Sequence, residues 1–555
     1  MTQTGVAGPV DVCVVGSGPA GLSVAHELIG RDLRVCVVES GERHFEPASQ
    51  ELSCGNVVDG LPGTNLVETR ARQVGGNSNL WCVKIGRRDR AWRLGVRYLP
   101  FADVDFEQRS WIPHSGWPFG LSDLQPHYQR AVELAQVSDA IEPITWQAHE
   151  RDPFGLDGPF EGRLFRFGPG AAFHQNLRAA VEATPGFTLL PGHTVVRIER
   201  KTDSPYARCA HLRTASGDAL TLDAKVFVLA GGGVENARLL LVSRDATGVA
   251  LGNGHDMVGR GFMDHPLLHV GNVVPHDVSL WREAGVYDFR DVNGALVHGY
   301  ARLSRAAMER HHVLGAALSI FPRPVARHTR AIDATRSLVT EVLSQRRVPP
   351  RAFEYVRDIM KGADALPGVV LQRLRGRPPL PGFGRGGWSE QARNERRYHH
   401  FEVMLQLEQA PDFDNRVMLS EDSDRFGVPL PTIRARLGDL DTYSIETIRN
   451  LIADAVAGAG RARFEPSRGV DGAPFPQPVS MAHHVGSTRM GTSPATSVVD
   501  PDGCLHEVPN IYVTGSSVFP TSSYANPTLT IVAVAARLGA HLARTLQQAP
   551  RVQTG

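Results

Sequence analysis

The stretch that decides the fold is residues 11–40, DVCVVGSGPAGLSVAHELIGRDLRVCVVES. It contains an apolar run, the turn Gly16-x-Gly18-x-x-Gly21, a helical pattern and a second apolar run that ends in Glu39. This order predicts a strand, a glycine turn, a helix and a second strand. Gly16 permits the tight turn, Gly18 lets the backbone approach a pyrophosphate, and Gly21 allows close packing of helix on strand. Because Glu39 can accept hydrogen bonds from ribose hydroxyls, the stretch predicts a dinucleotide site.

The composition is that of an ordinary globular protein. The chain has 555 residues, 42% of them hydrophobic, and this length suggests two or more structural units. Lys and Arg number 59 against 58 Asp and Glu, so bulk charge favours a neutral small molecule over nucleic acid or an anionic membrane. The six cysteines lack CxxC and CxC spacing, so neither a zinc site nor a disulfide framework is expected. The N-terminus lacks signal-peptide features and no run of about 18 apolar residues occurs, so we expect a cytoplasmic enzyme.

Three further glycine-rich segments accompany the first motif. They are RQVGGNSNLWC at 72–82, KVFVLAGGGVENARLLL at 225–241 and MVGRGFMDHP at 257–266. The segment at 225–241 predicts another strand that runs into a glycine turn and a helix, a pattern common near the flavin of two-domain flavoproteins. The first motif alone does not separate FAD from NAD. The additional segments favour FAD.

Residues 511–545, IYVTGSSVFPTSSYANPTLTIVAVAARLGAHLART, predict a strand, a turn of small residues and a helix. Pro527 suits the first helical position, and Asn526 stands where an N-cap would. If this helix N-terminus faces a flavin, it would stabilise the negative charge that appears on reduction. The alternative is a capped helix at the surface.

Two adjacent histidines stand in MAHHVGSTRMG, residues 481–491. One of them could be a catalytic base, both could bind a metal, or neither could matter. Adjacent side chains on an extended segment point to opposite faces, and no third ligand with suitable spacing is nearby, so we expect no metal site. His265 in MDHP is another base candidate by residue type. The alternative for His265 is a loop histidine that stabilises the flavin-domain fold.

These motifs, in this order, resemble the glucose–methanol–choline (GMC) oxidoreductases, within them the branch of pyranose oxidase and bacterial sugar and glycoside oxidoreductases. The resemblance extends to SGWPF (115–119), EQAPDFDNRVML (408–419) and NIYVTGSSVFPTSSYANPTLTIVAVA (510–535). It implies an α/β fold with a Rossmann-like FAD-binding domain and a substrate domain whose mainly antiparallel β-sheet covers the flavin. The expected FAD-binding domain comprises residues 1–100, 190–272 and 473–555. The expected substrate domain comprises 101–189 and 273–472, with an Arg-rich insertion or lid at about 321–400.

The resemblance also implies the catalytic residues. Alcohol oxidation by a flavin moves a hydride to flavin N5 while a base takes the hydroxyl proton. In the family the catalytic histidine precedes a glycine by three residues and a methionine by seven. His483 meets both counts, against Gly486 and Met490, whereas His484 meets neither and is expected at the flavin edge or the neighbouring loop. The family residue at the position of Asn526 faces the reacting carbon, although an asparagine that caps its own helix cannot do so.

The residues expected to hold FAD follow from the same motifs. Leu80 stands where several sugar oxidases carry a histidine bonded covalently to the flavin, so we expect non-covalent FAD. Cys82 falls where relatives carry Gly or Thr near the flavin, and Val195 where the backbone meets the adenine. The expected set is Gly16, Gly18, Pro19, Ala20, Gly21, Glu39, Ser40, Arg72, Gly75, Gly76, Asn77, Ser78, Asn79, Leu80, Trp81, Cys82, Val195, Ala230, Gly231, Gly232, Asn236, Gly515, Ser516, Pro527 and Thr528.

The sequence therefore predicts an FAD-dependent oxidoreductase that oxidises an alcohol of a sugar-like substrate, such as a pyranose, a C- or O-glycoside or an aminoglycoside-like compound. His483 is the expected base, Asn526 orients the hydroxyl, and oxygen or another acceptor reoxidises the flavin. The alternative is a hydroxynitrile lyase, which keeps FAD in the same fold and uses a histidine without net redox change. Substrate identity, electron acceptor and oligomeric state stay open, because specificity resides in side chains of the 275–470 region.

Overall fold

The first sheet is built around residues 10–38. β1 (Val10–Val15) and β2 (Val35–Val38) are parallel, with Val12 opposite Val35, and α1 (Pro19–Glu27) connects them. Except for the partly buried Val15, their valines are buried, as expected for central strands of a parallel sheet. The computed structural model describes residues 8–81, 83–87, 93–137, 145–147, 149–344, 351–377, 381–382 and 384–548.

The sheet extends from β1 in the order β21, β22, β10, β1, β2, β7. The strands from β22 to β7 are parallel, and β21 pairs antiparallel with β22. The first half of β10 pairs instead with β9, which pairs with β8. The bounds are β7 (Phe187–Leu190), β8 (His193–Arg200), β9 (Ala207–Thr214), β10 (Ala219–Leu229), β21 (Cys504–Leu505) and β22 (Val508–Val513).

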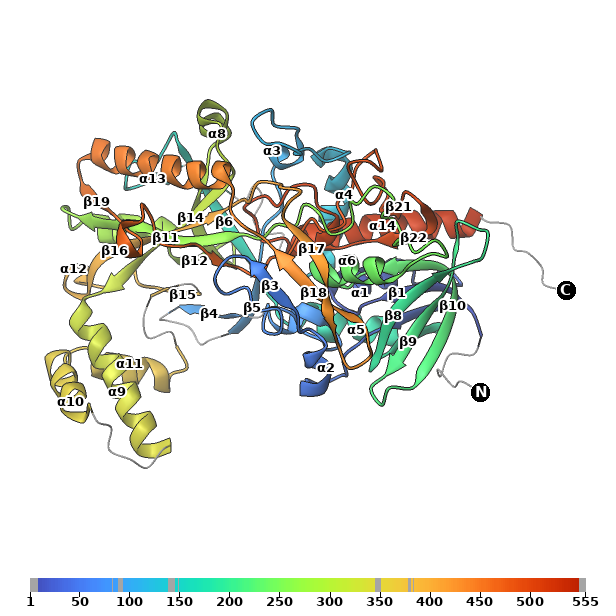
Figure 1. Cartoon of the computed structure of the whole chain (residues 1–555). Coiled ribbons are helices and arrows are strands. Elements are labelled where there is room, and N and C mark those ends of the chain that lie inside the picture. The colour runs from blue at the N-terminus through green and yellow to red at the C-terminus, as the bar shows by residue number, and fades with distance from the viewer. Residues whose placement is uncertain are drawn as a thin grey trace.

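The C-terminal helix α14 (Thr528–Gln548) packs against α1 and α4 (Leu121–Leu134), on the side of the molecule where both termini lie (Figure 1). Leu529, Val532 and Leu538 are buried in the same core as β1 and β2. Within the described ranges this is the one helix long and apolar enough to cross a bilayer, but 67% of its apolar window is buried inside the protein. That burial identifies α14 as a helix of the core.

The second sheet is mainly antiparallel. Its order is β15, β4, β5, β6, β13, β14, β16, β11, β19, with β12 beside β13 and β20 beside β11. Along it lies α13 (Asp439–Ala459), which buries Ile445, Ile448 and Ile452, spaced three and four residues apart (Figure 1). The bounds are β4 (Val83–Arg87), β5 (Arg93–Tyr98), β6 (Phe160–Pro169), β11 (Pro266–Pro275), β12 (Phe289–Val292), β13 (Ala295–Leu303), β14 (Ala316–Pro324), β15 (Arg385–Gly386), β16 (Tyr398–Leu407), β19 (Ala462–Pro466) and β20 (Val479–Ser480).

A small third sheet, in the order β17, β18, β3, lies against α6 (Gly232–Val242) of the first unit. This contact brings the turn between β17 and β18 to a helix that follows β10. The bounds are β3 (Asn56–Asp59), β17 (Arg416–Ser423) and β18 (Pro429–Arg434), and the shorter helices are α2 (Pro47–Glu51), α3 (Asp103–Phe106), α5 (Arg178–Glu182), α7 (Leu280–Glu283) and α8 (Arg305–His311).

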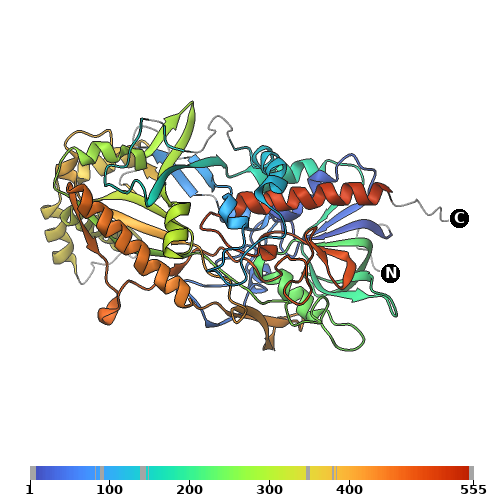
Figure 2. The same cartoon turned by 90° about the horizontal axis from the view of Figure 1, so that it is seen from above.

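The Arg-rich segment forms a helical arm between β14 and β16. Figures 1 and 2 show this arm at the end of the molecule opposite both termini. Phe353 and Met360 on the arm are 82% and 74% exposed. The helices are α9 (Ala326–Ser344), α10 (Ala352–Lys361), α11 (Leu366–Leu374) and α12 (Asn394–Arg397). The described part of the arm contributes no residue to the cavity that borders the glycine turn after β1, so its role as a lid stays a prediction.

The predicted α/β class, with a Rossmann-like unit and a mainly antiparallel second sheet, is confirmed. Two details differ from the expected outline. β4 and β5 fall within 1–100 yet pair into the second sheet, and β7 falls within 101–189 yet pairs with β2. The partner of a short strand is decided by contacts distant in sequence, which local pattern does not report. The remaining domain boundaries stay predictions.

Candidate active site

The glycine turn after β1 meets two different demands. Gly16 has a φ of +105°, and a Cβ there would lie 2.7 Å from the carbonyl oxygen of Ala230, so only glycine fits. A Cβ on Gly21 would lie 1.9 Å from the oxygen of Gly16. At Gly18 the situation is the reverse, because the nearest described atom to a Cβ is the Cα of Gly76 at 4.0 Å. Gly18 lines a cavity, so this open space is where a ligand can approach the backbone.

The cavity joins this turn to the C-terminal histidines and collects most of the residues expected to hold FAD. Those that line it are Gly16, Gly18, Pro19, Ala20, Glu39, Ser40, Arg72, Gly76, Asn77, Trp81, Val195, Ala230, Gly231, Gly232, Asn236, Gly515, Ser516, Pro527 and Thr528, together with His483. The expected residues that do not line it are Gly21, Gly75, Ser78, Asn79, Leu80 and Asn526. Cys82 lies outside the described residues.

The loop that leads to Trp81 uses its own polar side chains to hold its shape. Ser78 and Asn79 donate side-chain hydrogen bonds to backbone carbonyls of the same loop, at 2.6 to 3.1 Å. Asn77 also bonds to nearby backbone, but it lines the cavity. Of these three residues, Asn77 is therefore the one placed to meet a ligand. Leu80 is 47% exposed and stands outside the cavity lining.

Glu39 at the end of β2 is buried and already bound. Its carboxylate accepts hydrogen bonds from the backbone N–H and hydroxyl of Ser17, at 2.9 and 2.7 Å, and from the N–H of Gly41 at 2.9 Å. Burial raises the pKa of Glu39, and these donors offset part of that effect. Glu39 also lines the cavity at the expected ribose position. Its hydrogen bonds to Ser17 in the glycine turn hold its carboxylate in place there.

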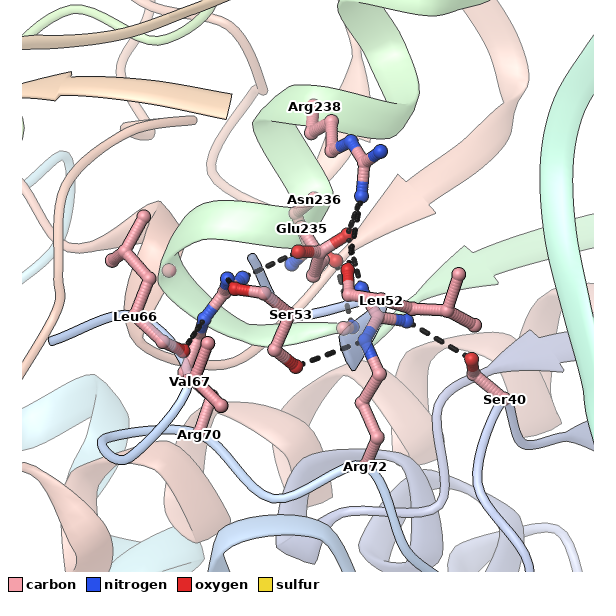
Figure 3. A network of polar contacts seen from close by, with 12 residues as sticks. Ser40, Leu52, Ser53, Leu66, Val67, Arg70, Arg72, Glu235, Asn236 and Arg238 are labelled. Atoms are coloured by element: carbon pink, nitrogen blue, oxygen red, sulfur yellow. Dashed lines mark hydrogen bonds and ion pairs between the residues drawn. The ribbon is translucent and has the colours of Figure 1, made fainter. Parts of the chain in front are cut away.

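A network of arginines around Glu235 forms another wall of the cavity (Figure 3). Arg70 pairs with one carboxylate oxygen of Glu235, and Arg72 and Arg238 lie 2.9 and 3.4 Å from the other. Arg238 also pairs with Asp424 of the β17–β18 turn at 2.8 Å. The network therefore ties the loop before Trp81, helix α6 and the third sheet to one another.

The electrostatics of this network are dominated by the arginines. Burial alone would raise the pKa of Glu235, but the guanidinium groups of Arg72, Arg238 and Arg70 hold it well below its usual range. Of the network, sequence reasoning identified only Arg72. The remaining members could have been suspected from the R-x-R spacing of Arg70 and Arg72 and from the E-x-x-R spacing of Glu235 and Arg238, which puts both on one side of a helix.

The segment that carries His483 is held against β11 by a buried aspartate. Asp264, 2% exposed, accepts hydrogen bonds from the backbone N–H groups of His265 and His483 at 2.7 and 2.8 Å. Its other carboxylate oxygen accepts from the hydroxyl of Ser480. Ala482 has a φ of +59°, an unfavourable conformation for a residue with a Cβ. The surrounding contacts thus impose the backbone direction at His483.

His483 and His265 form a hydrogen-bonded pair. Their Nδ1 atoms are 2.7 Å apart, and Nε2 of His265 lies 3.1 Å from the carbonyl oxygen of Ser522. Burial lowers the pKa of His265. The pKa of His483 lies well below 6.5, mainly because the ring is buried and also because His265, Arg97 and His484 disfavour a positive charge on it. Both rings are therefore neutral at neutral pH, which is the form in which a histidine can act as a base.

Asn526 turns its side chain toward His483. Its Nδ2 lies 3.4 Å from Nε2 of His483, and its Oδ1 is buried and has no hydrogen-bond partner within the described part of the chain. An asparagine that capped α14 would use Oδ1 for a backbone N–H of the first turn. The orientation therefore favours the substrate-facing geometry over the cap. A buried amide oxygen without a partner is costly, which indicates a donor supplied by a bound molecule.

His484 occupies a different environment from its neighbour. Its ring packs on Phe262, with ring centroids 5.5 Å apart, and it lines the cavity. Nε2 of His484 is buried and lacks a hydrogen-bond partner within the described chain. Burial lowers the pKa of His484 to about 4, so this ring is neutral as well. His484 thus lines the cavity with a free ring nitrogen among the described residues, and its expected place at the flavin edge stays a prediction.

The residues around the cavity fit FAD. The open approach at Gly18 suits a pyrophosphate, Glu39 borders the expected ribose position, and the start of α14 at Thr528 lines the far wall. The unpartnered polar atoms of Asn526 and His484 are at the end of the site that holds His483. A flavin bound here would have its dinucleotide part at the glycine turn and its reactive part near the histidines.

One other group of side chains has the spacing of metal ligands. Glu199, Cys209 and His211, on β8 and β9, have ligand atoms within 4.8 Å of one another. Glu199 is also bound by Arg208 at 2.5 Å, and His211 lies 3.0 Å from a guanidinium nitrogen of Arg197. A cation at this place would have to displace two arginines, so the arrangement is that of a surface ion-pair network. Neither His483 nor His484 belongs to it.

Comparison with protein families gives two matches. Residues 411–535 match the model described as GMC oxidoreductase, and residues 11–252 match the model described as FAD dependent oxidoreductase. The first match contains the histidine segment and the start of α14. The second contains the glycine turn, the loop to Trp81 and the Glu235 network.

Full-length relatives have low identity. The fructose dehydrogenase large subunit of Gluconobacter japonicus is 22% identical, over 97% of this chain and 98% of its own. The 6'''-hydroxyparomomycin C oxidase of Streptomyces lividus is 25% identical, over 96% and 92%. The C-glycoside 3-oxidase of Arthrobacter globiformis is 35% identical over 26% of each chain.

Among solved structures, a formate oxidase aligns with a TM-score of 0.55 at 17% identity, covering 98% of this chain and 99% of its own. A pyridoxine 4-oxidase from Mesorbium loti aligns with a TM-score of 0.53 at 16% identity, covering 96% and 98%.

Proposed function

Because the chain belongs to the FAD-dependent GMC oxidoreductases, we propose that it oxidises an alcohol group of a sugar-like substrate to a carbonyl, with His483 as the base. The observation that carries this proposal is the arrangement of His483, Asn526 and the cavity. His483, a neutral imidazole that lines the cavity, lies beside Asn526, whose amide oxygen has no hydrogen-bond partner within the described part of the chain. The imidazole supplies the base that removal of a hydroxyl proton requires, and the amide can orient the hydroxyl group.

The chain's own residues have separate tasks in this reaction. When bound, FAD supplies the acceptor for the hydride that leaves the alcohol carbon. Nε2 of His483 takes the hydroxyl proton, and its lowered pKa keeps it unprotonated until the substrate arrives. The amide of Asn526 orients the substrate oxygen, since its Nδ2 can donate to that oxygen and its Oδ1 can accept a proton from a neighbouring hydroxyl. The positive end of α14 favours negative charge at its N-terminus.

The substrate class rests on the relatives. Several are named for the oxidation of sugars or glycosides: fructose, an aminoglycoside and C-glycosides. A paromamine 6'-oxidase of Streptomyces fradiae is a further aminoglycoside enzyme, 25% identical over 95% of this chain. These names support a polyhydroxylated substrate. They do not support the hydroxynitrile lyase alternative, since these four relatives are named as oxidases or a dehydrogenase.

Anaerobic mixing of the purified holoenzyme with sugars, C- and O-glycosides, aminoglycosides and simple polyols tests the proposal. We expect at least one sugar-like compound to bleach the flavin absorbance, and parallel assays with oxygen and with a quinone or dye then identify the acceptor. If no compound of the panel reduces the flavin, whereas a cyanohydrin releases cyanide with the flavin oxidised, the oxidoreductase proposal is wrong.

We also infer that FAD is held without a covalent bond. Leu80 has no nucleophilic atom, and its side chain is half exposed outside the cavity lining. Precipitation of the holoenzyme with acid should therefore release all of the flavin into the supernatant, leaving a colourless pellet. Yellow protein after precipitation, or a flavin adduct on a tryptic peptide, would contradict the inference.

A further inference from the structure

The pair His265–His483 determines which nitrogen of His483 carries a proton. The carbonyl oxygen of Ser522 can only accept a hydrogen bond, so Nε2 of His265, 3.1 Å away, must be protonated. In the neutral ring Nδ1 of His265 then has a lone pair. Nδ1 of His483 lies 2.7 Å from that lone pair and must be the donor. The remaining nitrogen of neutral His483, Nε2, is therefore unprotonated.

This unprotonated nitrogen is the one that lies beside Asn526. Nε2 of His483 lies 3.4 Å from the amide nitrogen of Asn526, a donor, which agrees with a lone pair at this position. His483 also lines the cavity, whereas His265 is fully buried and is not among the residues that line it. His265 thus touches neither the cavity nor Asn526, and it acts only through the ring of His483.

The same carboxylate holds the backbone at both histidines. Asp264 accepts the backbone N–H groups of His265 and His483, and the N–H groups of Met263 and Val485 exchange hydrogen bonds with each other's carbonyls at 3.0 Å. Gln409 fixes Asp264 in turn, because the side-chain oxygen of Gln409 accepts a hydrogen bond from the backbone N–H of Asp264 at 2.8 Å. The distance between the two rings is therefore set by the backbone of two segments 218 residues apart.

We propose that His265 is a positioning residue that fixes His483 in the Nδ1–H tautomer, so that Nε2 is the nitrogen that accepts the substrate proton. This inference rests on the proposed role of His483 as base. Without an acceptor at Nδ1, the ring can adopt the Nε2–H tautomer, which has no lone pair directed at the site. The ring of His483 can also rotate, so that in part of the molecules no unprotonated nitrogen is directed at the substrate hydroxyl.

Two substitutions separate this role from simple packing. In His265→Asn the side-chain oxygen can take the place of Nδ1 and accept the proton of His483, although the bond to Ser522 is lost. In His265→Phe the ring volume remains but no acceptor is present. A matched control is His269→Phe, on the same strand β11, because His269 bonds only to Ser467 and Asn272 among the described residues.

The decisive measurement is nitrogen-15 NMR of the holoenzyme labelled at histidine, with the signals of His483 assigned by their loss in His483→Ala. We expect protonated Nδ1 and unprotonated Nε2 at His483 in the wild type, in His265→Asn and in His269→Phe, and a changed tautomer ratio in His265→Phe. Flavin reduction by substrate should slow about 10²-fold in His265→Phe and less than about tenfold in His265→Asn.

The outcome that would overturn the proposal is a wild-type His483 with its proton on Nε2, or a His265→Phe variant with unchanged His483 signals. The NMR measurement needs no substrate, so it decides about His265 even if the proposed reaction fails. If His265→Phe does not retain FAD, the wild type and His265→Asn still give the tautomer. Conversely, if His483 has the Nδ1–H tautomer but the enzyme oxidises no sugar-like compound, only the proposed function is wrong.

Discussion

Replacing His483 with alanine should slow flavin reduction by substrate about 10²- to 10⁴-fold, the usual contribution of a general base. The reason is geometric: Nε2 of His483 is the unprotonated nitrogen beside Asn526 at the end of the cavity. Stopped-flow absorbance under anaerobic conditions measures this step directly. FAD content and melting temperature should change little, because the ring bonds to His265 through one nitrogen and its backbone is held by Asp264.

His484→Ala is the matched comparison, since the two histidines are neighbours in sequence and both line the cavity. His484 packs on Phe262 and has no contact with Asn526 among the described residues, so its loss should affect FAD retention more than the proton transfer. Equal slowing by His483→Ala and His484→Ala would contradict the choice of His483 as base.

The pH profile gives an independent check of His483. Its pKa lies well below 6.5, because burial and then His265, Arg97 and His484 disfavour the imidazolium. A base with a lowered pKa stays unprotonated to lower pH, so the rate of flavin reduction should fall only below pH 6.5. In His483→Ala this acidic limb should disappear.

The sequence predicted those parts of the site in which function depends on local spacing. The glycines at 16, 18 and 21 predict a turn, a ligand approach and close packing within six residues. The structure shows a positive φ at Gly16, open space at Gly18 and a close backbone contact at Gly21. The count from His483 to Gly486 and Met490 likewise separates it from His484 within one loop. Such patterns are readable because the residues that fulfil them are neighbours in the chain.

Contacts between distant segments were not predictable in this way. His265 was interpreted as a base candidate or a fold-stabilising histidine, and its partner stands 218 residues further on. Ser78 and Asn79 looked like ligands of the flavin, but short polar side chains in a tight loop often bond to their own backbone instead. Glu235 was not singled out in the sequence, because the fold brings Arg70 and Arg72 to it from a loop more than 160 residues away.

Replacing Glu235 with glutamine should lower the free energy of unfolding by about 3–5 kcal/mol, the usual cost of removing one partner from a buried ion-pair network. Glutamine preserves the volume but leaves Arg70, Arg72 and Arg238 without the carboxylate that separates them. Because these side chains line the cavity, FAD should also dissociate more readily. Thermal unfolding of the holoenzyme and FAD retention on gel filtration measure the two effects.

The pH dependence distinguishes lost charge from lost shape. The folded-state pKa of Glu235 lies below its ordinary value of 4.5, so the carboxylate contributes stability above pH 4.5, and this contribution is lost as pH falls further. The stability difference between wild type and Glu235→Gln should therefore be largest at neutral pH and narrow below pH 4.5.

Glu199→Gln is the control: Glu199 pairs with Arg208 and Arg197 at the surface, where such pairs contribute about 0–1 kcal/mol. If both variants lose equally little stability, the Glu235 network does not hold the cavity wall together.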